Sequence, residues 1–175
     1  ITTTPGTDSK IQSETASAAG LVYNNSGTGK ITGCTVTCHS IIAKGYDSGE
    51  AAAGFVYSNN GLISRLEGGA ACSVTITGEI RGQLFAAGFA YRNYSGGKIS
   101  NCQVTLEEGT EIVAENFSGG AAGFACLIAG SATVSDCAVT GEKESSIYGY
   151  GARAAGFVLE LGNSDGSTAR VTDST

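Results

Sequence analysis

Hydrophobic and polar positions recur along this chain with one dominant period, which is carried by the phrase Ala-Ala-Gly followed by Phe or Leu. The repeat glycines are Gly20, Gly54, Gly88, Gly123 and Gly156, which lie 34, 34, 35 and 33 residues apart. A fixed period of this length is typical of repeat architectures, in which each unit packs against its neighbours. The sequence therefore predicts about five similar units.

A second phrase ends in Val-Thr and follows each of the first four glycines, for example "GKITGCTVT" and "GKISNCQVT". Its cysteines, Cys34, Cys72, Cys102 and Cys137, lie 14, 18, 14 and 14 residues after their glycines. The fifth copy, "ARVTDST", has Ser174 at this position, 18 residues after its glycine. Insertions of four residues account for the two longer intervals, and the cysteines are expected to form one column.

A third phrase precedes each Ala-Ala-Gly and carries an isoleucine among Gly, Glu and Ser. These isoleucines are Ile11, Ile42, Ile80, Ile112 and Ile147. Each repeat thus contains three short segments rich in Val, Ile, Thr, Phe and Tyr, separated by Gly, Asn and Ser turns, and no segment has the spacing of an amphipathic helix.

Three strands in each repeat of about 34 residues predict an all-β fold, a right-handed parallel β-helix (β-solenoid) of about five coils. A β-propeller is the competing fold, but its blades need about 40 residues, four strands and hairpin turns. Residues 1–15 are predicted to be an N-terminal linker or partial coil, and residues 16–175 a single β-solenoid repeat domain. The chain starts at Ile1 with no basic and apolar leader, so we expect it to be a mature or excised part of a longer polypeptide.

The residues around the repeat glycine predict which face of the strand is buried. The large side chains one and three positions after the glycine share one face, which we expect to point inward; they are Leu21, Phe55, Phe89, Phe124 and Phe157, then Tyr23, Tyr57, Tyr91, Cys126 and Leu159. This assignment leaves a smooth stripe of Ala, Gly and Val facing outward. The stripe is expected either to be covered within the chain or to pack against another domain or a second copy, which would make it a face for self-association.

Asn25, Asn59 and Asn93 occupy the fifth position after the first three glycines. Asparagine tolerates left-handed backbone, and stacked amides can form hydrogen bonds along a solenoid. We therefore expect a structural asparagine ladder at a corner of the coil, in preference to a ligand site.

Composition and charge exclude several classes of function. The chain has 27 Gly, one Pro, 15% charged residues and a net charge of −6, with its basic residues scattered singly. Nucleic acid and anionic membrane surfaces are therefore not expected as partners. No apolar run of about 18 residues is present, so no membrane span is expected in this fragment.

Six cysteines and one histidine are the main candidates for metal or nucleophilic chemistry. No Cys-x-x-Cys occurs, and the 34-residue rhythm favours inert stacked thiols over a zinc site, although one disulfide between coils stays open. Cys38, four residues after Cys34 and beside His39, is not explained by the column. His39 is expected to be a surface histidine, because no nucleophile motif accompanies it.

Carboxylates are the remaining candidates, because some parallel β-helices cleave polysaccharides with clustered acids. The acids lie at different phases of the repeat and no pair is expected to share a column; they are Asp47, Glu50, Glu79, Glu107, Glu108, Glu111, Glu142 and Glu144. We therefore predict no enzyme activity, no catalytic, cofactor-binding or metal-binding residue, and no cofactor.

The repeat resembles the GLUG motif family of bacterial surface proteins. The segments "GFVYSNNGLIS" (residues 54–64) and "GKISNCQVT" (residues 97–105) match the family phrase best, with Ala-Ala in place of the leading glycines and Tyr, Cys or Leu at a position that is commonly Gly. The resemblance extends from Ala18 to about Ser174. It implies a cell-surface or secreted location, in adhesins or beside immunoglobulin-A-cleaving peptidases, and it brings no catalytic residues.

The expected function is a non-catalytic, extracellular bacterial repeat module that acts as a stalk or adhesion domain of a larger protein, with its signal and anchor outside this fragment. Its partner would be a host or bacterial surface protein or a glycan. The alternative is a carbohydrate-binding or polysaccharide-degrading β-helix, whose site would lie on an exposed face with aromatic or acidic clusters.

Overall fold

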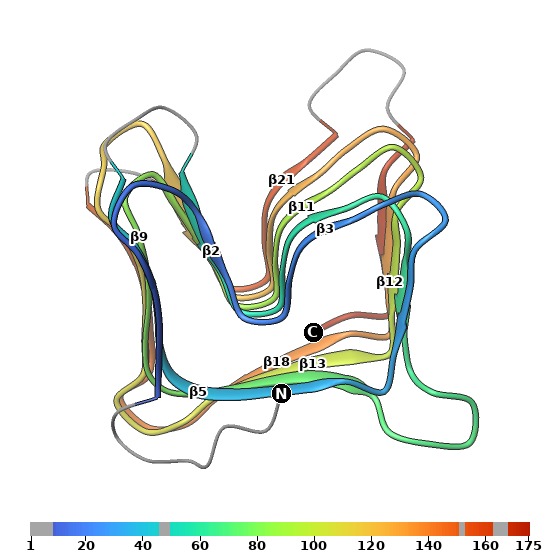
Figure 1. The fold of residues 1–175 in the computed structure, drawn as a ribbon, viewed down its shortest axis with the longest axis horizontal. Coiled ribbons are helices and arrows are strands. Elements are labelled where there is room, and N and C mark those ends of the chain that lie inside the picture. Colours follow the sequence, from blue (N-terminus) through green and yellow to red (C-terminus); the bar gives the residue numbers. More distant parts are fainter. Residues whose placement is uncertain (1–8, 46–49, 151–152, 163–167) are drawn as a thin grey trace.

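The computed structural model describes residues 9–45, 50–150, 153–162 and 168–175, and its regular elements in these ranges are all β-strands. The strands pair in parallel and stack in four sheets around a common axis (Figure 1). The path has about four turns, with equivalent positions about 34 residues apart, and is right-handed. The predicted β-solenoid is confirmed.

Sheet A forms the lower wall and the left wall of the coil in Figure 1. Its strands are β1 (Lys10–Ser13), β5 (Thr35–Ala43), β9 (Cys72–Gly82), β13 (Cys102–Leu106), β14 (Glu111–Ala114), β18 (Ala138–Gly141) and β19 (Ser146–Gly149). β5 and β9 run through the corner between the two walls, whereas turns at this corner separate β13 from β14 and β18 from β19.

Sheets B and C form a notch between the outer walls, and sheet D forms the right wall (Figure 1). Sheet B contains β2 (Ala18–Ala19), β6 (Ala51–Ala53), β10 (Phe85–Ala87), β15 (Gly120–Ala122) and β20 (Arg153–Ala155). Sheet C contains β3 (Val22–Asn25), β7 (Val56–Asn59), β11 (Ala90–Asn93), β16 (Ala125–Ile128) and β21 (Val158–Leu161). Sheet D contains β4 (Lys30–Thr32), β8 (Leu62–Ser64), β12 (Lys98–Ser100), β17 (Thr133–Ser135) and β22 (Arg170–Thr172).

The prediction of three strands per coil is wrong, because the Ala-Ala-Gly-Phe phrase bends at its glycine and contributes to two sheets. A Cβ atom on Gly54 would collide with the carbonyl oxygen of Gly88 in the next coil. Only glycine allows the backbones of successive coils to approach this closely at the bend. The repeat glycine therefore divides sheet B from sheet C, and each turn contributes to four sheets.

The bend also changes which residues point inward. Phe55, Phe89 and Phe124 are fully buried and stack with ring centroids 4.6 and 4.9 Å apart, as predicted for the Phe column. Val56 and Ala90, which follow these rings, are fully buried in the same main core. The predicted outward stripe of Ala, Gly and Val is thus wrong, because the turn at the glycine interrupts the in-and-out alternation of a single strand.

The Tyr column instead faces the notch between sheets B and C, where it forms a second, smaller core that we call the Tyr seam. Its buried members are Ala51, Ala53, Ala87, Tyr91, Ala122 and Cys126, with Tyr57, Phe85 and Leu159 packed against them. The alanine before each repeat glycine gives the room that these larger side chains fill.

The asparagine ladder is confirmed at the corner between sheets C and D. The side-chain nitrogen of Asn25 donates to Oδ1 of Asn59 at 2.7 Å, and that of Asn59 donates to Oδ1 of Asn93 at 2.8 Å. Asn59 also donates to the carbonyl of Gly61 at 3.2 Å. Asn59 and Asn93 are fully buried, so these bonds satisfy amides that water cannot reach.

The isoleucine column lies on the left wall with one change from the prediction. β1 pairs with β5 so that Ile11 lies beside Ile41, and Ile41 lies beside Ile80 of β9. Ile41, not Ile42, therefore occupies the column. β1 lies inside the segment predicted as linker or partial coil, of which residues 1–8 are outside the described residues.

No helix within the described ranges is long and apolar enough to cross a membrane.

Candidate functional site

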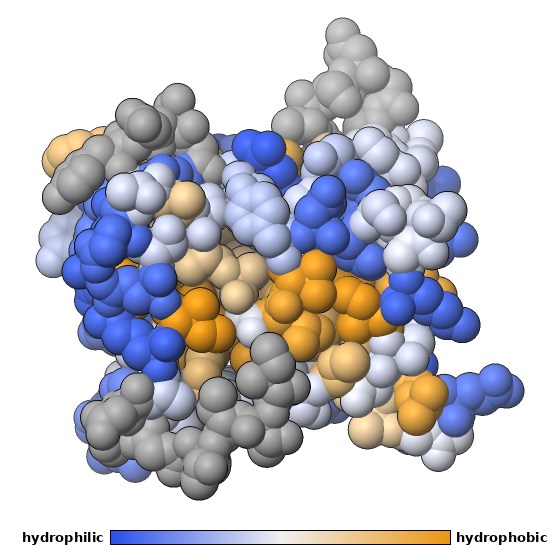
Figure 2. Space-filling view, in the orientation of Figure 1, coloured by the Kyte–Doolittle hydropathy of each residue, from blue (hydrophilic) through white to orange (hydrophobic). Residues whose placement is uncertain are grey.

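Charged and aromatic side chains gather on the outer face of the left wall. Because Ile80, Ile112 and Ile147 point into the core, the residues on either side of them point outward. We call this surface the Arg81 wall; it is formed by Glu79, Arg81, Glu111, Val113, Glu115, Tyr148 and Tyr150. The left edge of the molecule in Figure 2 is correspondingly hydrophilic.

The wall brings together acids that the sequence separates. Glu79 of β9 and Glu111 of β14 are directly paired neighbours in sheet A. The prediction that no two acids share a column is therefore wrong. The coils pass the corner of sheet A in different ways, because β9 runs through it without a break whereas residues 107–110 form a turn between β13 and β14. Residues at the same distance from their repeat glycine therefore need not be neighbours in the sheet.

Arg81 is the centre of this acidic group. Its Nε lies 2.7 Å from Oε2 of Glu79, and its terminal nitrogens lie 3.1 Å from Glu115 and 3.8 Å from Glu111. The Arg81 side chain is 29% exposed, and those of its partners are 28% to 53% exposed. Exposed pairs of this kind stabilise a fold weakly, so the arrangement mainly fixes the direction of the guanidinium and leaves three carboxylates beside one cation.

Hollows lie on both sides of Arg81. One, of about 350 Å³, is lined by Arg81, Glu111, Val113 and Ser146 and is bordered by Tyr148 and Tyr150. The two tyrosines are 50% and 54% exposed, and their rings meet edge to face with centroids 4.9 Å apart.

The second hollow, of about 280 Å³, lies toward the N-terminal coils. Arg81 lines it together with Glu79, Glu115, Lys44 and Gln83. The two hollows share Arg81, so the wall offers aromatic rings, hydrogen-bond donors and carboxylates over one continuous surface.

The notch between sheets B and C is closed by side chains, so it offers no comparable site. Tyr23 and Tyr57 stack at 4.4 Å, and Phe85 of sheet B packs 5.1 Å from Tyr91 of sheet C. At the C-terminal end, an ion pair joins Arg153 of sheet B to Glu160 of sheet C. Side chains fill this notch in the space-filling view (Figure 2).

The single histidine has a structural position at the corner of sheet A. Nδ1 of His39 lies 3.2 Å from the hydroxyl of Thr77, and the ring covers Gly78, where a Cβ atom would collide with it. His39 is half-buried, so the predicted surface histidine is only partly exposed. It is not among the residues that line the two hollows of the Arg81 wall.

Cys34, Cys72, Cys102 and Cys137 form the predicted column, and all six cysteines of the chain are free thiols. Cys72 pairs directly with Cys102, its Sγ accepts the N–H of Cys34 at 3.4 Å, and the hydroxyl of Ser174 accepts the N–H of Cys137 at 3.2 Å.

Burial suppresses the reactivity of several of these thiols. It raises the pKa of Cys38 to about 11, and it also raises the pKa of Cys126 in the Tyr seam. Hydrogen bonds with Cys137 and Cys72, together with burial, raise the pKa of Cys102. These three side chains are therefore thiols at neutral pH, and the thiolate is the form that attacks or binds metal. Hydrogen bonds with Cys102 have the opposite effect on its neighbours in the column: they lower the pKa of Cys72 to about 6 and also lower the pKa of Cys137. Within the described ranges, no group of three or more His, Cys, Asp or Glu residues is arranged to hold a metal ion.

The other predicted acids do not join the wall. Glu107 and Glu108 lie in the exposed turn after β13, and Glu142 and Glu144 lie in the exposed turn after β18. Glu50 immediately precedes β6, and Asp47 lies outside the described residues.

Sequence reasoning missed Arg81, Tyr148 and Tyr150 as candidate binding residues. The signal that could have found them is the alternation in the third phrase, because the residue after each column isoleucine must point outward. Comparisons with models of protein families, with curated proteins and with solved structures found no match to this chain.

Proposed function

We propose that this chain is a non-catalytic, extracellular module of a larger bacterial surface protein, in which the solenoid acts as a stalk and the Arg81 wall as its interaction face. The observation that carries the proposal is the continuous tie between coils. Stacked rings from Phe55 to Phe157 and hydrogen-bonded amides from Asn25 to Asn93 run along the axis of the coil. Such a filled, regularly bonded column suits a rigid spacer.

The surface location rests on the likeness of the repeat to the GLUG phrase. It can be tested with antibodies against this chain on intact cells that produce the full-length parent protein. We expect labelling without permeabilisation and loss of the signal after external protease treatment. Labelling only after permeabilisation would contradict an extracellular role.

A second candidate function, carbohydrate binding, is favoured by the exposed tyrosine pair beside the hollow at Arg81. Aromatic faces pack against the C–H surfaces of sugars, while guanidinium and carboxylate groups form hydrogen bonds with hydroxyls. Tyr148 and Tyr150 supply the rings, and Arg81 and Glu111 supply the polar groups on the same surface.

A glycan array, followed by calorimetry with each glycan retained, tests this second function. We expect Tyr148→Ser and Tyr150→Ser to weaken binding at least tenfold. Tyr23→Ser is the matched control, because Tyr23 is 57% exposed but lies away from the Arg81 wall, where it stacks on Tyr57 of the Tyr seam. No binding of any glycan, or equal loss in the control, would exclude the Arg81 wall as a sugar site. Release of new reducing ends from a bound polysaccharide would instead show a degrading enzyme and contradict the non-catalytic proposal.

A further inference from the structure

A further hollow lies apart from the Arg81 wall, where β11 and β16 run side by side in sheet C, at the upper right of Figure 1. It has a volume of about 370 Å³ and is lined by Arg92 and Leu127 of these strands and by Tyr94 and Ala129, which follow them. This volume lies within the range of about 300–1,000 Å³ that is common for small-molecule sites. One cation thus lies beside three apolar or aromatic side chains.

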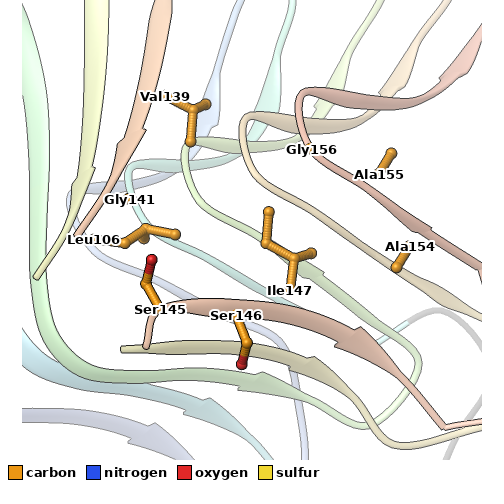
Figure 3. A pocket seen from close by; sticks show the side chains of 9 residues that line it. All are labelled: Leu106, Val139, Gly141, Ser145, Ser146, Ile147, Ala154, Ala155 and Gly156. Atoms are coloured by element: carbon orange, nitrogen blue, oxygen red, sulfur yellow. The ribbon is translucent and has the colours of Figure 1, made fainter. Parts of the chain in front are cut away.

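A hollow of similar size shows what the cation adds. It has a volume of about 300 Å³ and lies where the side chains of Leu106, Val139 and Ile147 gather (Figure 3). Its other lining residues are Ser, Gly and Ala, so none of its lining residues is charged. It offers apolar contact, but no charge that would select an acid over a neutral molecule. The hollow at Arg92 has both.

Arg92 is held in place without a carboxylate. Its guanidinium lies over the ring of Tyr91, 4.5 Å from the centroid, and Nη2 donates to the Tyr91 hydroxyl at 2.7 Å. In the described ranges, the arginines that form ion pairs are Arg81 and Arg153, and Arg92 is not among them. Stacking on a ring fixes the plane of a guanidinium, while its N–H groups lie in that plane and match the two oxygens of a carboxylate. Arg92 is therefore oriented but not neutralised.

Two buried polar atoms at this place have no hydrogen-bond partner among the described residues. They are Nε of Arg92 and Oγ of Ser58, and the two residues are direct neighbours in sheet C. Ser58 is only 7% exposed. Both groups can donate, and most buried donors in proteins have an acceptor. A carboxylate has two oxygens that only accept, and it also carries the charge opposite to that of Arg92.

The rest of the lining indicates what the carboxylate is attached to. Tyr94 and Leu127 are half-buried and Ala129 is buried, so they form an apolar surface beside the guanidinium. Apolar groups are stabilised by leaving water. A ligand rich in hydroxyl groups would instead lose hydrogen bonds to water that Leu127 and Ala129 cannot replace. The lining therefore favours a carboxylate on a hydrocarbon or aromatic group over a sugar acid.

We propose that the hollow at Arg92 binds a small apolar carboxylate, with the carboxylate on the Arg92 guanidinium and the carbon group on the apolar side chains that line the hollow. The Arg81 wall does not compete for this ligand, because three carboxylates surround Arg81 and repel an anion. The proposal does not depend on the function proposed above.

Titration of the purified chain with phenylacetate, followed by amide NMR, tests the proposal. We expect a dissociation constant in the millimolar range, as is usual for so small a ligand, with saturable shifts at Arg92, Tyr94, Leu127 and Ala129. Phenylacetamide should bind at least tenfold more weakly, because it has no charge to pair with the guanidinium. Glucuronate should also bind at least tenfold more weakly, because its carboxylate is attached to a hydroxylated ring.

Three variants locate the binding. Arg92→Gln should abolish the saturable shifts, and Arg92→Lys should weaken binding at least fivefold, because an ammonium group cannot form the two parallel bonds of a guanidinium. Leu127→Glu leaves Arg92 unchanged but places a carboxylate beside it in the sheet, so it should block the added acid. Arg65→Gln is the matched control, because Arg65 is exposed and donates to the carbonyl of Gly69 in the turn after β8. This variant should bind phenylacetate as the original chain does.

Thermal unfolding establishes whether Arg92→Gln is folded, and Leu127→Glu decides the question if it is not. Equal binding of phenylacetate and phenylacetamide would show apolar contact alone, and equal binding of phenylacetate and glucuronate would show an adventitious ion only. Either result would overturn the proposal. So would the absence of saturable shifts at the lining residues, or shifts that Leu127→Glu and a folded Arg92→Gln leave unchanged.

Discussion

The main core and the Tyr seam are built from one repeated phrase, yet they bury their aromatic rings in different ways. In the main core, Phe89 and Phe124 are fully buried and nearly parallel, with an angle of 3° between rings. In the seam, exposure changes from 57% at Tyr23 to 3% at Tyr91, and the rings of Tyr57 and Tyr91 are tilted by 47°. The main core is enclosed by all four sheets, whereas sheets B and C alone enclose the seam. Enclosure, and not ring type, should therefore decide how much each column stabilises the fold.

The largest expected effect is at the main core. Phe89→Ala removes a ring that contacts Phe55 and Phe124 on both sides and leaves a cavity that four sheets hold open. We expect the free energy of unfolding to fall by about 3–5 kcal/mol, as is usual for such truncations. Denaturant titration of the monomeric protein measures this loss. A loss near 1 kcal/mol would mean that the Phe column is not a main source of the free energy of unfolding.

The second prediction concerns the asparagine ladder at the corner between sheets C and D, where β7, the strand of Tyr57, ends at Asn59. Asn59→Ala removes one bond from Asn25, one to Asn93 and one to the carbonyl of Gly61. The Asn25 amide keeps the carbonyl of Leu62, and the carbonyl of Gly61 keeps the N–H of Lys98, whereas the buried Oδ1 of Asn93 loses its donor. Because each lost buried hydrogen bond costs about 1 kcal/mol, we expect a loss of about 2–3 kcal/mol. Hydrogen exchange should show faster opening at this corner than in the left wall. Equal exchange at both places would show that the ladder is not a local tie.

Much of the main core could be predicted from the sequence, whereas the Tyr seam and the Arg81 wall could not, for physical reasons. The period, the buried Phe89, the ladder at Asn59 and the Cys column follow from repetition, because equivalent residues of successive coils must stack. The division of Tyr91 from Phe89 does not follow, since residues two apart in one strand should share a face. Phe89 instead lies with Gly88 in the bend, outside strand β11 (Ala90–Asn93) that carries Tyr91. The Arg81 wall could not be predicted by counting from the glycine, because segments of unequal length precede Glu79 and Glu111.

A smaller effect is expected in the buried part of the seam. Tyr91 packs on Phe85, and its hydroxyl accepts a bond of 2.7 Å from Arg92. Tyr91→Ala should cost about 2 kcal/mol, less than Phe89→Ala, since the seam can close partly over the gap. Tyr91→Phe keeps the packing and loses only the polar contact, so it should cost less than about 1 kcal/mol. Unfolding titrations of the two variants separate the ring from its hydroxyl, and a cost of Tyr91→Ala equal to that of Phe89→Ala would remove the distinction between the cores.

The smallest effect is expected at Tyr23, the exposed end of the same column. Its ring stacks on Tyr57 at 4.4 Å and is 57% exposed, so Tyr23→Ala should cost about 1 kcal/mol or less. Tyr91→Ala removes a ring of the same column that is only 3% exposed, and its cost should be about twice as large. Unfolding titrations of the two variants under the same conditions measure this difference. Equal costs at the exposed and the buried end of the column would show that enclosure does not decide how much a ring stabilises the fold.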